Sequence, residues 1–231
     1  MDQKKMASEK AAEYIHDGMI VGLGTGSTAF YLVEKLGEMV KQGLSIRAVA
    51  TSINTSRHAK KLGIPLISIE DVDAIDLVID GVDEIDPDFN AMKGGGGALF
   101  REKMVAEAAK EVIWIMDSSK QVDALGAFPL PVEILSYGYT HILKKMEEQL
   151  LHPQLRRTNF KNFITDNHNY IVDLHLGKPF DIKVVTEKLN GITGVMEHGL
   201  FLNLCSRIIV GTDTGVKIFE NATRFSKNLP N

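Results

Sequence analysis

Short apolar runs alternate with stretches of helical periodicity along the first half of this 231-residue chain. The apolar runs predict buried strands at 19–23, 45–50, 65–69, 75–79 and 112–116. The intervening stretches predict helices at 4–15, at 29–42 and around 56–62. Strands that alternate with helices at this spacing indicate a parallel, doubly wound sheet. This part of the chain is therefore expected to form a Rossmann-like domain.

The pattern changes after Pro129 and Pro131. Here the sequence predicts a strand at 132–135, a helix at 141–150, a hairpin over 163–172 and a helix at 181–189. The apolar run 208–211 is expected to return to the first sheet. The predicted fold class is α/β, a Rossmann-like parallel sheet domain with a second, smaller α+β domain inserted before the C-terminal return. The predicted boundaries are 1–128 with 205–231 for the first domain and 129–204 for the second.

Small, polar or charged residues follow four of the predicted strands, at the point where each strand ends. These segments are 25–28, 51–52, 80–83 and 117–120. In a doubly wound sheet, ligands bind beyond the C-terminal ends of the strands, near a switch point in the strand order. The four segments together predict a ligand site at this edge more strongly than any one motif does.

A run of four glycines, 94–97, follows Lys93 and precedes a predicted helix. Because glycine has no Cβ, such a run allows a ligand to approach the backbone closely. In the helix, positions 98, 102, 105, 109 and 112 share one face, and all are apolar except Glu102. Arg101 and Lys103 are expected on other faces. Glu102 is therefore a candidate catalytic base, and the alternative is a partly exposed glutamate at a helix edge.

The segment Gly22-Leu23-Gly24-Thr25-Gly26-Ser27-Thr28 lies between a predicted strand and a predicted helix. A dinucleotide-binding motif would need a glycine in place of Ser27 and an acidic residue at the end of the next strand, which ends Ala50-Thr51-Ser52. A nicotinamide cofactor is therefore disfavoured. Backbone N–H groups and hydroxyls at a helix N-terminus suit a single phosphate instead. A tight turn that only caps the helix is the alternative.

Two carboxylates, Asp80 and Asp83, follow the buried strand 75–79. They could bind sugar hydroxyls or take part in acid–base chemistry, and an Asp-Gly turn with solvated acids is the structural alternative. A metal site is also open, because Glu84 and Asp86 add two more carboxylates. The seven histidines are scattered without the spacing of transition-metal ligands, so they do not support a transition-metal site, and no bound metal is predicted.

Composition narrows the class of protein. The apolar content of 44% and the charged content of 24% are ordinary for a globular protein, and the net charge of -4 gives no reason to expect a nucleic-acid partner. No stretch is long and apolar enough for a membrane span, so no membrane association is expected. The lone Cys205 excludes an internal disulfide and fits a cytoplasmic location.

Seven segments resemble ribose-5-phosphate isomerase, type A, and they span nearly the whole chain in the expected order. They are Gly24-Thr25-Gly26-Ser27-Thr28, Asp80-Gly81-Val82-Asp83-Glu84, Lys93-Gly94-Gly95-Gly96 with Ala98-Leu99-Phe100-Arg101-Glu102-Lys103, Ser119-Lys120-Gln121, Phe128-Pro129-Leu130-Pro131-Val132-Glu133, Thr165-Asp166-Asn167 and Glu197-His198-Gly199-Leu200-Phe201. The residues from about Asn221 onward match no motif of this family. Minor departures occur at Val82, where alanine is usual, at His168, where glycine is usual, and at 212–215.

The resemblance implies an enzyme that interconverts D-ribose 5-phosphate and D-ribulose 5-phosphate through an enediolate without a cofactor, in the non-oxidative branch of the pentose phosphate pathway. It implies that Glu102 is the base, that Asp80 and Asp83 bind hydroxyls and assist proton transfer, and that Lys93 stabilises the enediolate oxygen. The residues expected to bind substrate are Thr25, Gly26, Ser27, Thr28, Asp80, Gly81, Val82, Asp83, Lys93, Gly94, Gly95, Gly96, Lys120 and Lys4. At the N-terminus the match is weak, so Lys5 is an alternative to Lys4.

The resemblance also implies a homodimer or homotetramer, with the 129–204 domain expected to serve oligomerisation. A non-catalytic sugar-phosphate sensor on a related sheet is the alternative function. Such a sensor would need a DNA-binding or partner module, and the first predicted helix leads almost directly into the first strand.

Overall fold

The computed structural model describes residues 2–222, and it divides into two compact units. The first unit contains residues up to 82, 101–120 and those from 202 on, and the second contains 83–100 and 121–201. The boundaries expected from sequence, 1–128 with 205–231 and 129–204, place 83–100 and 121–128 in the first domain instead. The contacts of these two segments explain the difference, because Ile85 forms a parallel bridge with Gln121 and its carbonyl accepts the Val122 N–H at 2.9 Å.

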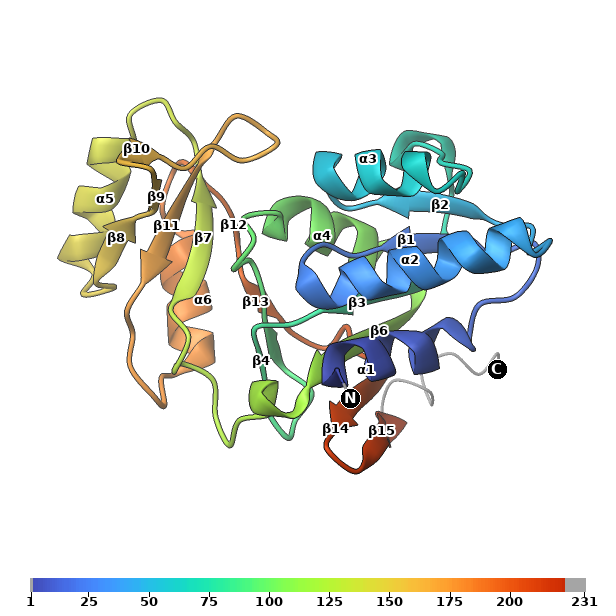
Figure 1. Cartoon of the computed structure of the whole chain (residues 1–231). Helices are drawn as coiled ribbons and strands as arrows, with labels where there is room; N and C mark the ends of the chain where they lie inside the picture. The colour runs from blue at the N-terminus through green and yellow to red at the C-terminus, as the bar shows by residue number, and fades with distance from the viewer. Residues whose placement is uncertain (1, 223–231) are drawn as a thin grey trace, which may run out of the picture. The chain divides into compact units, whose positions relative to one another are not determined.

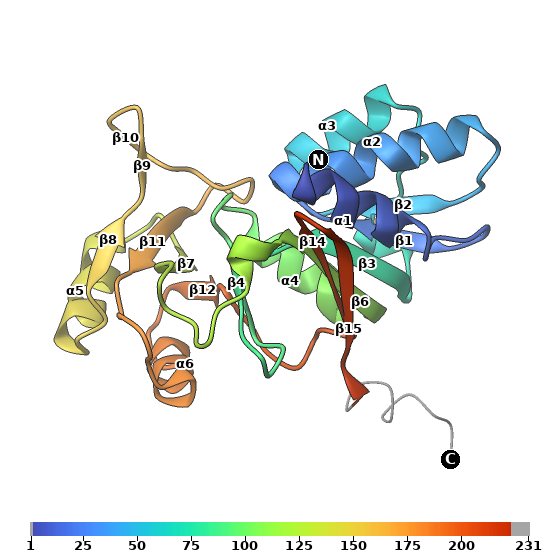
Figure 2. The same cartoon turned by 60° about the horizontal axis from the view of Figure 1, so that its bottom comes forward.

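The first unit is built on a six-stranded sheet in the order β15-β14-β6-β3-β1-β2 (Figure 1). Every neighbouring pair is parallel except β14 and β15, which form an antiparallel hairpin that Figure 2 shows edge-on. The expected parallel sheet is confirmed, as is the return of the chain near 208–211. The strands are β1 (Ile20–Leu23), β2 (Arg47–Ala50), β3 (Ile75–Gly81), β6 (Ala109–Asp117), β14 (Arg207–Thr212) and β15 (Gly215–Glu220).

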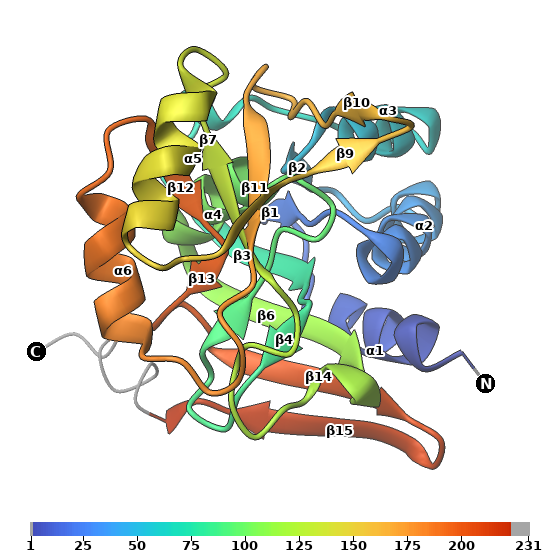
Figure 3. The ribbon, with the colours of Figure 1, turned by 90° about the vertical axis from the view of Figure 1, so that its left-hand side faces the viewer.

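Helices cover both faces of this sheet. The first three are α1 (Gln3–Ala12), α2 (Ser27–Lys41) and α3 (Ile53–Lys61), and they lie on one face (Figure 3). Alternate strand residues, including Val21, Leu23 and Ile79, join the apolar core beneath them. On the other face lies α4 (Leu99–Glu107), where Val105 packs so closely on β1 that a Cβ on Gly22 would come within 2.8 Å of it.

Two expectations about the local elements are wrong. The helix that carries Glu102 was expected to extend to position 112, but it ends at Glu107, and Ala109 already pairs with Ile75 in the sheet. An apolar residue every three or four positions is compatible with a short helix followed by a buried strand, so periodicity alone cannot place this boundary. The strand expected at 65–69 is a single bridge from Leu66 to Ala48, followed by the 3-10 helix η1 (Ile69–Asp71).

The second unit contains the β-α-β-β-α-β arrangement that is typical of ferredoxin-like folds. Its antiparallel sheet has the order β12-β7-β11-β8, and α5 and α6 pack on it through apolar residues such as Met146 and Leu189. The hairpin expected over 163–172 is confirmed by the antiparallel bridge between Ile164 and Tyr170. These elements are β7 (Leu130–Ile134), α5 (Tyr139–Glu148), β8 (Pro153–Leu155), β11 (Tyr170–Leu174), α6 (Ile182–Asn190) and β12 (Val195–His198).

Two smaller sheets complete the second unit. A hairpin of β9 (Arg157–Thr158) and β10 (Lys161–Asn162) lies between β8 and β11 in the sequence. The other sheet has the order β13-β5-β4, with β4 (Glu84–Ile85), β5 (Ala91–Met92) and β13 (Leu200–Phe201). None of the helices within residues 2–222 has both the length and the apolar character needed to cross a bilayer.

Candidate active site

The loop after β1 presents backbone N–H groups at the N-terminus of α2. Gly26 is the residue before this helix and has φ 108°, a conformation that favours glycine. Both Gly26 and Ser27 are exposed, and Lys4 on α1 donates from Nζ to the Ser27 hydroxyl at 3.0 Å. Lys5 instead lies 3.8 Å from Glu9 on the same helix. Of the two N-terminal lysines, Lys4 is therefore the one beside the loop, where a helix N-terminus and a cation together suit a phosphate.

Two residues of α1 that the sequence did not single out hold this region together. Ser8 is fully buried, and its hydroxyl lies 2.8 Å from the carbonyl oxygen of Thr28. Gln3 accepts from the Ser118 N–H at 3.0 Å, at the start of the 3-10 helix η2 (Ser118–Lys120) that contains Lys120. The only sequence signal for Ser8 is a small polar residue among the alanines of a buried helix face.

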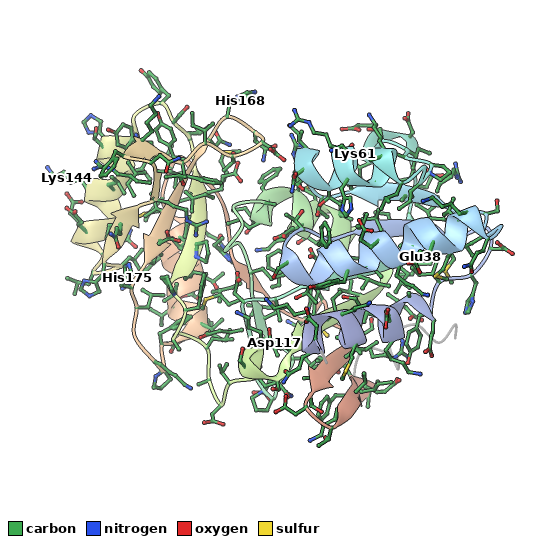
Figure 4. The ribbon with its side chains drawn as sticks, in the orientation of Figure 1. Glu38, Lys61, Asp117, Lys144, His168 and His175 are labelled. Atoms are coloured by element: carbon green, nitrogen blue, oxygen red, sulfur yellow. The ribbon has the colours of Figure 1, made fainter. Side chains whose placement is uncertain are left out.

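The segment after β6 is fixed by its own side chains. Asp117, the last residue of β6 (labelled in Figure 4), accepts from the Ser119 N–H at 3.0 Å and from the Ser119 hydroxyl. Lys120 is half-buried at the end of η2. Gln3 therefore joins the segment that carries Lys120 to α1, the helix that carries Lys4.

The Thr25 side chain belongs to a cluster of four hydroxyls. Its Oγ1 lies 2.8 Å from Thr51, 2.9 Å from Ser52 and 3.2 Å from Thr55. Thr51 and Ser52 occupy the end of β2, where a dinucleotide-binding sheet would have an acidic residue. The cluster thus ties the β1 loop to the end of β2, and Thr25 remains half-buried.

Asp80 at the end of β3 is 1% exposed and is held by backbone N–H groups. Its Oδ1 accepts from Thr25 N at 3.0 Å and from Gly81 N at 2.7 Å. A Cβ on Gly24 would lie 2.0 Å from the same oxygen, so only glycine allows this approach. Gly24 is therefore a structural requirement of the Asp80 position. Val82 occupies a position where alanine is usual in the family that the motifs resemble. Its side chain is buried, with 9% exposed.

Glu102 lies in the first turn of α4 and is 5% exposed. The expectation that it is buried is confirmed. Lys103, the next residue along the helix, is 6% exposed and is therefore buried as well, although it lies on another face. A lysine in a helix is usually solvated, and nothing in the local pattern distinguishes Lys103 from such a residue.

In the second unit, the β4–β5 hairpin positions Asp83 and Lys93. The ladder ends with the pair of Glu84 and Met92, and Asp83 N donates to Met92 O at 2.8 Å, so Asp83 and Lys93 both lie at this end of the hairpin. Lys93 is 2% exposed, and its Nζ lies 5.4 Å from the centre of the Phe201 ring.

The glycine run forms a tight turn directly after Lys93. Gly97 N donates to Gly94 O at 2.9 Å, and both residues have positive φ, 104° at Gly94 and 76° at Gly97. Gly95 N donates to Asp83 Oδ2 at 2.7 Å, and a Cβ on Gly95 would lie 2.7 Å from the other oxygen of that carboxylate. The turn and Asp83 therefore fix each other.

The acidic residues after Asp83 have structural roles. Glu84 accepts from Gly126 N at 2.8 Å and from Phe128 N at 2.6 Å. Asp86 accepts from Asn90 N at 2.9 Å and from Asn90 Nδ2 at 3.0 Å. Within residues 2–222, no group of three or more His, Cys, Asp or Glu side chains is arranged to hold a metal ion. The geometry therefore gives no support to the metal hypothesis for 80–86.

A parallel sheet with a glycine-containing loop before α2 and buried carboxylates is compatible with an aldose–ketose isomerase, and the comparisons with known proteins show that class. A model of the family described as ribose 5-phosphate isomerase A (phosphoriboisomerase A) matches residues 47–215. The chain belongs to this family, as the resemblance in its motifs implied.

Relatives from several sources agree. The ribose-5-phosphate isomerase A of Streptococcus suis (strain 05ZYH33) is 50% identical over 218 residues, which cover 94% of this chain and 97% of that protein. The structure of the Methanocaldococcus jannaschii enzyme is 33% identical with a TM-score of 0.88, covering 94% of this chain and 98% of that one. A ribose-5-phosphate isomerase solved in complex with phospho-erythronic acid is 37% identical with a TM-score of 0.90, covering 96% and 100%. These matches leave no support for the sensor alternative.

Proposed function

We propose that this chain interconverts D-ribose 5-phosphate and D-ribulose 5-phosphate through an enediolate, with Glu102 as the base. The observation that carries the proposal is the burial of this carboxylate, 5% exposed, in the first turn of α4. A buried carboxylate is shielded from water, which favours the abstraction of a proton from carbon. Family membership supports the substrate.

The reaction needs three contributions from the chain. Glu102 removes the proton from C2 of the open-chain aldose, and the electron pair moves through C2–C1 to the carbonyl oxygen. The ammonium of Lys93 and the N–H groups of the glycine turn stabilise that oxygen as its charge develops. Glu102 then returns the proton to C1 while Asp80 and Asp83 bind the hydroxyls and pass a proton between the two oxygens, which gives the ketose.

The phosphate end requires cations and backbone donors. The loop formed by Thr25, Gly26, Ser27 and Thr28 supplies N–H groups, and Lys4 lies 3.0 Å from the Ser27 hydroxyl. Lys120 in η2 adds further positive charge. No cofactor takes part in this scheme.

Glu102→Gln tests the base, and Glu107→Gln is the matched control because Glu107 is an exposed glutamate on the same helix. A general base contributes roughly 10²–10⁴-fold, so we expect kcat of the Glu102 variant to fall by at least that order, with the Kd for ribose 5-phosphate within a few-fold of wild type. Ketose formation is measured with a discontinuous assay, and deuterium incorporation at C1 of ribulose 5-phosphate is followed by NMR in D₂O.

Turnover near the wild-type rate in Glu102→Gln would remove Glu102 as the base. Loss of deuterium incorporation with retained binding would support it. Each variant is also assayed with a chelator, and a loss of wild-type activity there would revive a metal role for Asp80 to Asp86.

We also propose a homodimer or homotetramer whose contacts come from the smaller unit, and a cytoplasmic location. Large apolar side chains are exposed on this unit, with Phe160 at 100%, Tyr137 at 92% and Leu150 at 73%. Large exposed apolar side chains are candidates for burial in an interface. Sedimentation velocity tests the proposal, and a monomer at micromolar concentration would contradict it. The buried lone Cys205 is compatible with a reducing compartment.

A further inference from the structure

Arg156 lies between β8 and β9 of the second unit, outside every segment that pointed to the family. Its side chain is 14% exposed and forms a two-pronged ion pair with Asp173 on β11. Arg156 Nε donates to Asp173 Oδ2 at 2.8 Å, and Nη2 donates to Oδ1. Such a pair fixes the plane of the guanidinium as well as its position.

The remaining nitrogen of this guanidinium binds the glycine turn. Arg156 Nη1 donates to Gly94 O at 2.9 Å and to Gly95 O at 3.1 Å. A single charged donor group therefore holds the carbonyl groups of two successive peptides. Lysine could not make these bonds and the two-pronged pair together, because it has one nitrogen.

The carbonyl and the following N–H of a trans peptide point in opposite directions. When Arg156 holds Gly94 O, the N–H of Gly95 points away from the guanidinium, and it donates to Asp83 Oδ2 at 2.7 Å. When Arg156 holds Gly95 O, the N–H of Gly96 must likewise point away from it. The arginine thus sets the direction of two donors in the segment proposed to face the enediolate oxygen.

Phe163 contacts both Arg156 and the glycine turn. Phe163 N donates to Arg156 O at 2.9 Å, and the guanidinium carbon lies 5.8 Å from the centre of the Phe163 ring. The same ring lies against the turn, since a Cβ on Gly97 would come within 2.4 Å of it. Movement of Arg156 would therefore disturb the turn from two sides.

We propose that Arg156, fixed by Asp173, is a positioning residue for the isomerisation: it holds the glycine turn so that the Gly95 N–H holds Asp83 and the Gly96 N–H faces the developing oxyanion. The inference rests on the proposed function, because it needs the turn to act on the enediolate. Arg156 itself contacts no reacting atom in this scheme. Removal of the Arg156 side chain should weaken the interactions at the reacting end of the substrate and leave the binding of its phosphate group unchanged.

The test compares Arg156→Ala and Arg156→Lys with Arg157→Ala, which removes the exposed neighbouring arginine. Misplacement of catalytic donors by about 1 Å costs about 10²-fold, so kcat of Arg156→Ala should fall roughly 10- to 100-fold, with a smaller change in KM. Arg156→Lys should recover only part of the loss, and Arg157→Ala should match wild type. Two competitive inhibitors serve as probes: phospho-erythronate, which carries a carboxylate at the reacting end, and inorganic phosphate.

We expect the Ki of phospho-erythronate to rise about as much as kcat/KM falls, while the Ki of phosphate stays within twofold. A merely structural arginine would weaken both inhibitors together, and that result would overturn the inference. Wild-type kcat in Arg156→Ala would overturn it as well. If that occurs while Glu102→Gln is inactive, the proposed function stands and only the role of Arg156 fails. An active Glu102→Gln would instead remove the proposed base.

Discussion

Replacement of Gly24 by alanine tests how closely the β1 loop and Asp80 are packed. The new Cβ would lie 2.0 Å from Asp80 Oδ1, 2.2 Å from its Cγ and 2.6 Å from its Cα, so rotation of the side chain cannot relieve the clash. Overpacking of this kind costs about 1–3 kcal/mol. Displacement of the carboxylate also weakens its hydrogen bonds from Thr25 N and Gly81 N, each worth about 1.5–3 kcal/mol for a charged acceptor.

These contributions overlap, so we expect a loss of about 3–6 kcal/mol in the free energy of unfolding, with Tm lower by roughly 10 °C. If the variant folds, kcat/KM should fall by about 10²-fold, because Asp80 no longer occupies its position. Urea unfolding and the ketose assay measure the two effects. Gly191→Ala is the control, since its Cβ would meet only ordinary contacts, the nearest at 3.5 Å, and Gly191 has φ -86°. A Gly24→Ala enzyme as stable and active as this control would refute the reasoning.

Three further predictions concern single side chains. The backbone N–H of Ile20 and the Lys110 ammonium hold the pKa of Asp76 below its ordinary value of 3.8. The contribution of this carboxylate to the free energy of unfolding is therefore complete above pH 3.8 and is lost as the pH falls through the folded pKa. Urea unfolding should show Asp76→Asn about 1 kcal/mol less stable than wild type at pH 7, and the difference should shrink below about pH 4. Because His168 has φ 63°, His168→Gly should raise Tm by about 1–4 °C with unchanged kcat, measured by calorimetry and the ketose assay. Ser8→Ala should raise KM for ribose 5-phosphate several-fold more than it lowers kcat, since Ser8 bonds to Thr28 in the loop proposed to bind the phosphate; an unchanged KM would contradict that role.

The sequence predicted the large sheet and the loops at its edge because both depend on local patterns. Apolar runs bounded by glycine or by short polar segments identify buried parallel strands, and the ends of such strands lie at one edge by topology. Gly26 and the turn at 94–97 were identifiable for the same reason, since positive φ is a local property of the chain. Glu102 stood out as the one acid on an otherwise apolar helix face.

Residues whose roles depend on distant partners could not be found in this way. Ser8 bonds to a residue 20 positions away in the loop proposed to bind the phosphate, and Arg156 holds carbonyl groups 61 and 62 positions away. Neither belongs to a local pattern, because a serine in a helix and an arginine near a strand are common and usually solvated. The end of α4 was misplaced for a different reason, since Ala109 fits both the helical and the strand pattern.

The acidic segment after β3 shows why residue type alone does not assign chemistry. Asp80, Asp83, Glu84 and Asp86 fall within seven positions, yet the backbone N–H groups that each one meets differ. Asp86 accepts a hydrogen bond from Asn90 in its own turn, and Glu84 accepts hydrogen bonds from backbone amides 42 and 44 positions later. Both carboxylates therefore stabilise the local backbone. Asp80 and Asp83 instead each accept an N–H from a loop proposed to bind substrate, that of Thr25 for Asp80 and that of the glycine turn for Asp83. The same bonds that fix these two carboxylates therefore fix the loops, so replacing either aspartate should disturb substrate binding as well as proton transfer. Asp80→Asn and Asp83→Asn should consequently change KM along with kcat, whereas Glu102→Gln should change kcat alone.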